Sequence, residues 1–148
     1  MTIQLATELA NMPELTALTF ENNIIEDQSA VCALFSNLKT FDKLESLNIR
    51  GNNFSKQVFS ALCEGIDGKK ELRTVDLGEN ELDDTSIKNL SQALKQHVRL
   101  HMLFLDNNQI TSRGASAIAE CLKGKQDLRV LNIDNNQIGT EGALKLAE

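Results

Sequence analysis

The sequence predicts an α/β solenoid in which a short strand and a helix alternate along the chain. Three observations support this prediction. One pattern of apolar residues and an asparagine occurs five times within 148 residues, the interval between occurrences is nearly constant, and apolar residues at helical spacing follow the pattern. A fixed interval of this length is typical of stacked repeat units, and each unit here is predicted to run strand, turn, helix, turn.

The strand half of each unit has the pattern L-x-x-L-x-L-x-x-N-x-L, in which Ile, Val or Phe replaces some leucines. The first step between units is 29 residues and the next three are 28. We number repeat positions from the first leucine of each unit, which is position 0. These leucines are Leu15, Leu44, Leu72, Leu100 and Leu128.

The helix half of each unit shows apolar residues at i, i+3 and i+7, which is one face of a helix. The second, third and fourth units carry them at the same positions, and the first unit carries them one residue later, which places its extra residue in the loop before the helix. They are Val31, Leu34, Leu38; Phe59, Leu62, Ile66; Ile87, Leu90, Leu94; and Ala115, Ile118, Leu122. Gly68 and Gly124 are predicted to follow helix ends in a left-handed conformation. Predicted helix N-caps are Asp84, Ser112 and Thr140.

A single unit cannot cover the apolar stripes of both its strand and its helix, so neighbouring units must stack. Stacking predicts a horseshoe with a parallel sheet on the concave face and helices on the convex face. We expect one domain over residues 1–148, with a partial repeat helix in 1–14 marked by Leu5 and Leu9. The last unit is incomplete. This predicts either a part of a longer repeat array or a short protein that tolerates frayed ends or pairs them with a second copy, an edge-mediated self-association.

The 28-residue motif, with GASAIAECL in one helix, resembles leucine-rich repeats of the ribonuclease-inhibitor type. The resemblance implies a protein–protein interaction scaffold whose concave face binds a partner protein. That family also contains GTPase activators of the Ran type, and we keep this as the alternative, with Arg50 and Arg113 as the candidate arginines. A ribonuclease inhibitor itself is not expected, since Trp is absent and Cys occurs only three times.

Residues at positions 2, 4 and 6 must point away from the core, because successive strand side chains alternate between the two faces. Phe104 stands out at position 4, where the other units have Thr, Asn or Asp. An exposed apolar cluster ringed by polar groups has the composition of an interface centre. The predicted partner-binding residues are Met102, Phe104, Val130, Asp76, Asp106, Asn132 and Asp134. The competing interpretation is that Phe104 lies flat and merely shields the sheet.

Asp106 and Asp134 share position 6 in adjacent units, so their carboxylates can approach within about 5 Å. A weak cation site and a solvated acidic patch are both compatible with this pair. Catalysis is not expected there, because an open sheet excludes no water. We therefore predict no catalytic residues, no enzyme activity and no metal site.

The asparagine at position 8 recurs in every unit, as Asn23, Asn52, Asn80, Asn108 and Asn136. A buried amide at such a turn can bond backbone groups that a tight bend would leave unpaired. The sequence therefore predicts a structural asparagine ladder whose loss lowers stability.

Composition excludes several function classes. The net charge of −6 disfavours nucleic acid and anionic membrane as partners and favours a basic protein partner. Three widely spaced cysteines form no C-x-x-C pair, which indicates reduced thiols and a cytoplasmic location. No cofactor is implied.

Overall fold

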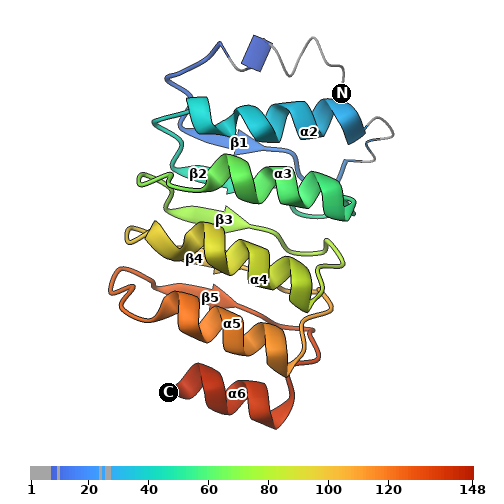
Figure 1. The fold of residues 1–148 in the computed structure, drawn as a ribbon, viewed down its shortest axis with the longest axis vertical. Helices are drawn as coiled ribbons and strands as arrows, with labels where there is room; N and C mark the ends of the chain where they lie inside the picture. The colour runs from blue at the N-terminus through green and yellow to red at the C-terminus, as the bar shows by residue number, and fades with distance from the viewer. Residues whose placement is uncertain (1–7, 10, 24, 26–27) are drawn as a thin grey trace.

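The elements alternate as the repeat pattern predicts (Figure 1) in the computed structural model, which describes residues 8–9, 11–23, 25 and 28–148. The strands are β1 (Ala17–Thr19), β2 (Ser46–Asn48), β3 (Thr74–Asp76), β4 (Met102–Phe104) and β5 (Val130–Asn132). The helices are α2 (Gln28–Ser36), α3 (Lys56–Ile66), α4 (Asp84–Ala93), α5 (Ser112–Leu122) and α6 (Gly139–Ala147). Two 3-10 segments, η1 (Asn37–Thr40) and η2 (Leu94–Gln96), extend α2 and α4. Leu5 lies outside the described residues.

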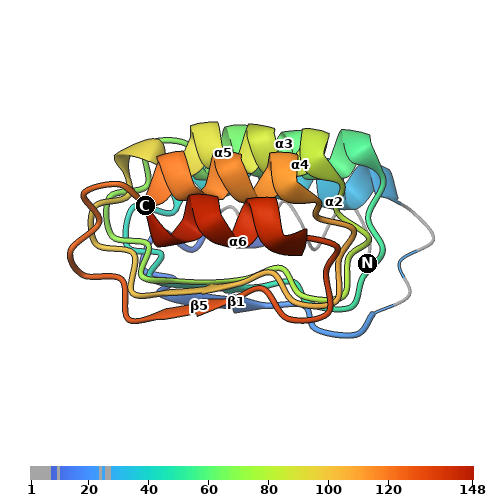
Figure 2. The ribbon, with the colours of Figure 1, turned by 90° about the horizontal axis from the view of Figure 1, so that it is seen from below.

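The five strands form one parallel sheet in chain order. Equivalent repeat positions pair with each other, so Leu18 lies opposite Leu47 and Leu103 lies opposite Leu131. All the helices cover one face of the sheet, and the other face is left uncovered (Figure 2). This two-layer stack confirms the predicted α/β solenoid.

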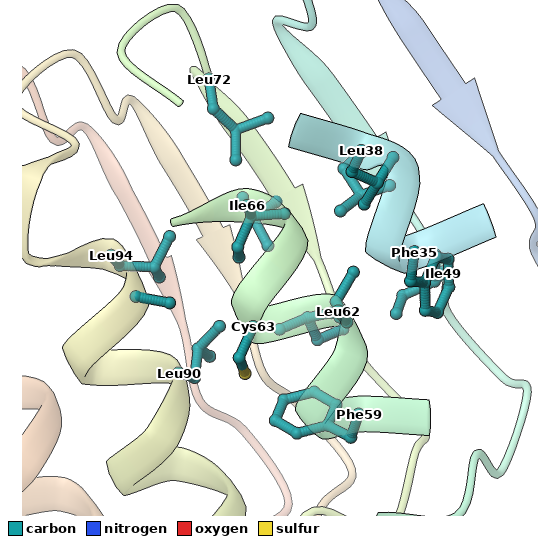
Figure 3. Close-up of a cluster of buried hydrophobic side chains, with 14 of the residues drawn as sticks. Phe35, Leu38, Ile49, Phe59, Leu62, Cys63, Ile66, Leu72, Leu90 and Leu94 are labelled. Carbon is teal, nitrogen blue, oxygen red and sulfur yellow. The ribbon is translucent and has the colours of Figure 1, made fainter. Parts of the chain in front are cut away.

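A continuous apolar core fills the space between the sheet and the helices (Figure 3). In the second unit β2 and the residue after it contribute Leu47 and Ile49, and α3 contributes Leu62 and Ile66, all at 0% exposure. Burying a side chain of this size stabilises the fold by about 1.5–3 kcal/mol. The apolar pattern therefore recurs because each unit completes the core of its neighbours.

The predicted helix N-caps are wrong, by one residue for α4 and α5 and by two for α6, whose N-cap is Ile138. The side chains of Asp83 and Thr111 accept hydrogen bonds from the first turns of α4 and α5, while α6 begins with no side-chain cap. Asp84 is used by the next unit instead. Its carboxylate accepts hydrogen bonds from the backbone N–H and hydroxyl of Thr111, at 2.8 and 2.6 Å, and from the N–H of Gly114 at 3.0 Å. One acidic residue thus closes the start of its neighbour's helix, where negative charge is favourable.

The helices end in two alternating ways. Helices α3 and α5 are followed by Gly68 and Gly124 at φ of 75° and 79°, which confirms the predicted left-handed glycines. Helices α2 and α4 continue into η1 and η2 instead. The lysine after each glycine is buried and donates to carbonyls at the end of the preceding unit's helix: Lys69 to Lys39 O, and Lys125 to Leu94 O. The ammonium groups thereby satisfy carbonyls at the negative helix ends.

His97 occupies the repeat position of these lysines and is fully buried, with no hydrogen-bond partner for either ring nitrogen among the described residues. Burial, followed by the nearby charge of Lys125, lowers the pKa of His97; the carbonyls of Ile66 and Leu94 oppose this shift without reversing it. The folded state therefore keeps the imidazole neutral at pH values where the unfolded chain, with an ordinary pKa of about 6.5, already binds a proton.

We expect this proton imbalance to make the protein less stable as pH falls below about 6.5, by up to about 1.4 kcal/mol per pH unit until the lower folded-state pKa is reached. The His97→Phe variant should remove that part of the pH dependence, because Phe41 already fills the equivalent buried position of an earlier unit. Urea unfolding of both proteins between pH 5 and 7.5 measures the difference. Identical pH slopes would contradict this account of His97.

Candidate functional site

The uncovered face of the sheet, here called the sheet face, is the candidate site. It is formed by the side chains at positions 2, 4 and 6. Each strand spans positions 2 to 4, and its middle residue points into the core while the flanking residues are more exposed. The alternation predicted for the strands is therefore present.

Three apolar side chains on the sheet face form an apolar patch, which consists of Met102, Phe104 and Val130. Met102 pairs with Val130 across β4 and β5. Met102 and Phe104 are half-buried, and Val130 is 37% exposed. None of the three belongs to the buried core or to the apolar residues packed against it. The patch is therefore separate from the apolar contacts that hold the repeats together.

Phe104 also lacks a side chain–backbone hydrogen bond that three other units form at position 4. In units 2, 3 and 5 the Asn or Asp at position 4 accepts a hydrogen bond from the backbone N–H two residues later, at 3.0 to 3.1 Å. Those residues are Asn48, Asp76 and Asn132. Phe104 has no acceptor to offer. A hydrogen bond of this kind is worth about 0.5–1.5 kcal/mol, so the ring replaces a stabilising residue.

Arg50 lies at the centre of an ion network that crosses three units. Its Nη1 and Nη2 donate to the two carboxylate oxygens of Asp106 at 3.0 and 2.6 Å. The same side chain contacts Glu79 at 2.7 Å and Asp76 at 3.4 Å. Arg50 belongs to unit 2 and Asp106 to unit 4, so the guanidinium passes over unit 3. We call these four residues the Arg50 network.

Gly78, at position 6 of unit 3, makes this crossing possible. A Cβ atom added there would lie 2.5 to 2.6 Å from three atoms of the Arg50 guanidinium. Any larger residue must therefore displace the arginine from its partners. Position 6 is therefore Arg50, Gly78 and Asp106 in units 2, 3 and 4. The arginine and the aspartate form an ion pair that passes over the glycine.

The Arg50 network also sets the charge state of Asp106, whose side chain is only 8% exposed. Burial disfavours the charged form, but hydrogen bonds from Arg50 and Asn107 outweigh it and lower the pKa of Asp106. Asp106 reciprocally raises the pKa of Arg50. The bidentate geometry is the strong form of a charge-assisted pair.

These contacts engage three of the four residues of the polar rim predicted around Phe104. Asp76 and Asp106 are bound to Arg50, and Asn132 donates its amide to Asp106 at 3.2 Å. Asp134 is exposed, and its carboxylate forms no ion pair or hydrogen bond with the described residues. Because Arg50 holds Asp106, the cation site considered for Asp106 and Asp134 is not supported. In the part of the chain that is described, no group of three or more His, Cys, Asp or Glu residues could hold a metal ion.

The asparagines at position 8 lie beside the sheet face and bond the turns of neighbouring units. The amide nitrogens of Asn52, Asn80, Asn108 and Asn136 each donate to carbonyls of their own unit and of the preceding one. Their Oδ1 atoms accept backbone N–H groups of the preceding unit. The residue before each ladder asparagine has a positive φ, and in unit 3 this residue is Glu79 at 56°.

Comparison with known families decides what this arrangement is. Family models described as leucine-rich repeat match residues 43–64, 101–119 and 124–147. The chain is a leucine-rich repeat protein. The ribonuclease-inhibitor-like type, inferred from the 28-residue spacing, stays a prediction within that family.

This leucine-rich repeat protein is 30% identical over 97 residues to human NACHT, LRR and PYD domains-containing protein 13. The match covers 66% of this chain and 9% of the relative's length. The fold is similar to the tropomodulin C-terminal domain of Caenorhabditis elegans, with a TM-score of 0.80, 13% identity, and 96% and 89% coverage of the two chains. Leiomodin-1 actin-binding site 2 follows with a TM-score of 0.63, 17% identity, and 98% and 68% coverage.

Sequence reasoning missed two features of this leucine-rich repeat sheet. The first is the Arg50 network, whose signal in the sequence is the glycine between Arg50 and Asp106 in the column at position 6. The second is the column at position 1, where units 3 to 5 carry Arg73, His101 and Arg129.

In the described residues, no helix is long and apolar enough to span a bilayer.

Proposed function

We propose that this chain is a protein-interaction scaffold that binds a partner protein through the sheet face, with Met102, Phe104 and Val130 at the centre of the contact. The observation that carries the proposal is Phe104. Its unit gives up a hydrogen bond present in three of the other four, in exchange for a partly buried ring outside the core. Large exposed aromatics surrounded by polar groups are typical of interface hot spots.

The proposed rim consists of Asp134 as a direct contact and of Asp76, Asp106 and Asn132 as an ordered polar border. Their mutual bonds support the rim by holding it in one geometry before binding, which lowers the entropy lost on association. The leiomodin-1 structure is named for an actin-binding site, and this supports a protein as the class of partner for a domain of this fold. We propose no nucleic acid partner, and a cytoplasmic location stays a prediction.

No observation favours the alternative of a Ran-type GTPase activator. Such an activator would need an arginine free to contact a bound nucleotide. Arg50 is held by three carboxylates, and Arg113 is exposed at the start of α5, away from the sheet face.

The Phe104→Asn variant tests the proposal. We expect its free energy of unfolding to equal that of the wild type or to exceed it by up to about 1 kcal/mol, since the regained hydrogen bond offsets the lost ring contact. Binding of a captured partner should fall at least tenfold, which corresponds to the loss of one hot-spot side chain. Urea unfolding and affinity capture from lysate, followed by titration with the purified partner, measure the two effects.

Val98→Asn is the matched control. Val98 is 62% exposed in the turn before β4, so this variant removes an equally apolar group away from the sheet face. It should bind like the wild type. If Phe104→Asn lost several degrees of melting temperature and kept full binding, the ring would belong to packing and the proposal would fail.

A further inference from the structure

Ion pairing engages most of the charged side chains on the sheet face and at position 1, just before the strands, in units 2 to 4. The Arg50 network holds three carboxylates, and Arg73 lies 3.6 Å from Glu45. In unit 5 two charged side chains have no such partner among the described residues. Arg129 and Asp134 are both exposed, and neither side chain forms an ion pair or hydrogen bond with the described residues.

These two charges have opposite signs and flank the apolar patch. Arg129 stands at position 1, immediately before β5, and follows Arg73 and His101 in that column, where unit 2 carries Glu45. Asp134 stands at position 6, beyond the other end of β5, on the side of the Arg50 network. That network has one cation and three carboxylates, so its side of the sheet is acidic even after pairing.

We call position 1, with Arg73, His101 and Arg129, the basic border, and position 6, with Asp106 and Asp134, the acidic border. The strands fix the distance between the two borders. Five residues at about 3.3 Å each separate positions 1 and 6, so the borders are about 17 Å apart. The strands all run in the same direction (Figure 1), so the basic border lies at the N-terminal ends of the strands and the acidic border at their C-terminal ends. Met102, Phe104 and Val130 lie between them at positions 2 and 4.

We propose that the partner presents a two-signed segment: an acidic side chain over Arg129 and His101, an apolar side chain on Phe104, and a lysine or arginine over Asp134. This inference rests on the proposed function and specifies the chemistry of the partner. Opposite charges at the two borders select one orientation of the segment, because the reversed orientation places like charges together. It replaces the uniformly basic partner that the net charge of −6 suggests.

A displayed library of random dodecapeptides is the probe. It is selected against the wild-type chain, and peptides retained equally by Phe104→Asn are discarded. We expect the remaining peptides to carry acidic residues, an apolar residue and basic residues in a fixed order. The Arg129→Glu and Asp134→Lys variants should each weaken such peptides about two- to fivefold, the size expected for an exposed charge pair, and more strongly at low salt.

The double variant Arg129→Glu, Asp134→Lys is the decisive selection. Both side chains lack partners within the described chain, so the fold should tolerate the exchange, which equal melting temperatures would verify. The enriched peptides should then show the reverse charge order. Peptides that depend on Phe104 but are all basic, or keep their charge order in the double variant, would overturn the inference and leave the proposed function standing. Absence of any Phe104-dependent peptide would overturn both.

Discussion

Asn108→Ala is expected to lower the free energy of unfolding by about 3–5 kcal/mol. The Asn108 side chain makes five hydrogen bonds to backbone groups. Its amide donates to the carbonyls of Leu77, Leu105 and Asp106, and its Oδ1 accepts the N–H groups of Asn80 and Leu82, at distances from 2.8 to 3.2 Å. Each buried group left without a partner costs about 1 kcal/mol or more. A loss above 4 kcal/mol would place this substitution among the most damaging single changes.

The matched control is Asn23→Ala, the same substitution at the same position of the first unit. Asn23 is exposed, and among the described residues its side chain donates one hydrogen bond, to Glu21 O at 3.0 Å. We expect its removal to cost about 1 kcal/mol. Urea unfolding of both variants gives the comparison. Equal losses would show that the number of bonds to neighbouring turns does not govern the contribution of a ladder asparagine.

This ladder shows what the sequence could predict. Asparagine at position 8 recurs because each side chain bonds its own turn and the preceding one, so the requirement repeats with the unit and is visible as a period. The same holds for the core leucines and for the exposed side chains at positions 2 and 4. Phe104 was detectable for the opposite reason, as the one residue that breaks a shared pattern.

Contacts between units that do not recur in every unit were not predictable in this way. Asp84 was assigned to its own helix, because an acidic residue at a helix start usually caps that helix, yet its carboxylate bonds Thr111 and Gly114 of the next unit. The predicted acidic rim likewise treated Asp106 as free, since the column at position 6 does not show that Arg50 can reach it across a full unit. Side-chain length and direction decide both cases, and repeat periodicity contains neither.

Replacing Arg50 with alanine is the second substitution with a large expected effect, a loss of about 2–4 kcal/mol. Asp106 would remain buried without the cation that compensates its charge, and removing one partner of such a pair costs more than the pair itself contributes. The pKa of Asp106 should rise, because burial remains after the hydrogen bonds from Arg50 are gone. Urea unfolding measures the stability, and a carboxylate NMR titration measures the pKa.

Arg99→Ala serves as the comparison for this change. Arg99 also makes a short ion pair, to Glu71 at 2.6 Å, but the two side chains are 52% and 39% exposed. Exposed pairs contribute about 0–1 kcal/mol, so this variant should be nearly neutral. If both arginine variants lost the same stability, burial of Asp106 would not be the cause.

Gly78→Ala separates the crossing of Arg50 over unit 3 from the ion pairs themselves. In the wild-type chain the added methyl group displaces the guanidinium, and we expect a loss of about 2 kcal/mol, less than the roughly 3–5 kcal/mol typical of removing one partner of a buried pair. In the Arg50→Ala background no guanidinium remains to displace, so the same change should cost less than about 0.5 kcal/mol. The two substitutions should therefore be strongly non-additive in a double-mutant cycle. Additive losses would mean that Gly78 serves the backbone alone, and that the sequence Arg, Gly, Asp at position 6 is not selected as a unit.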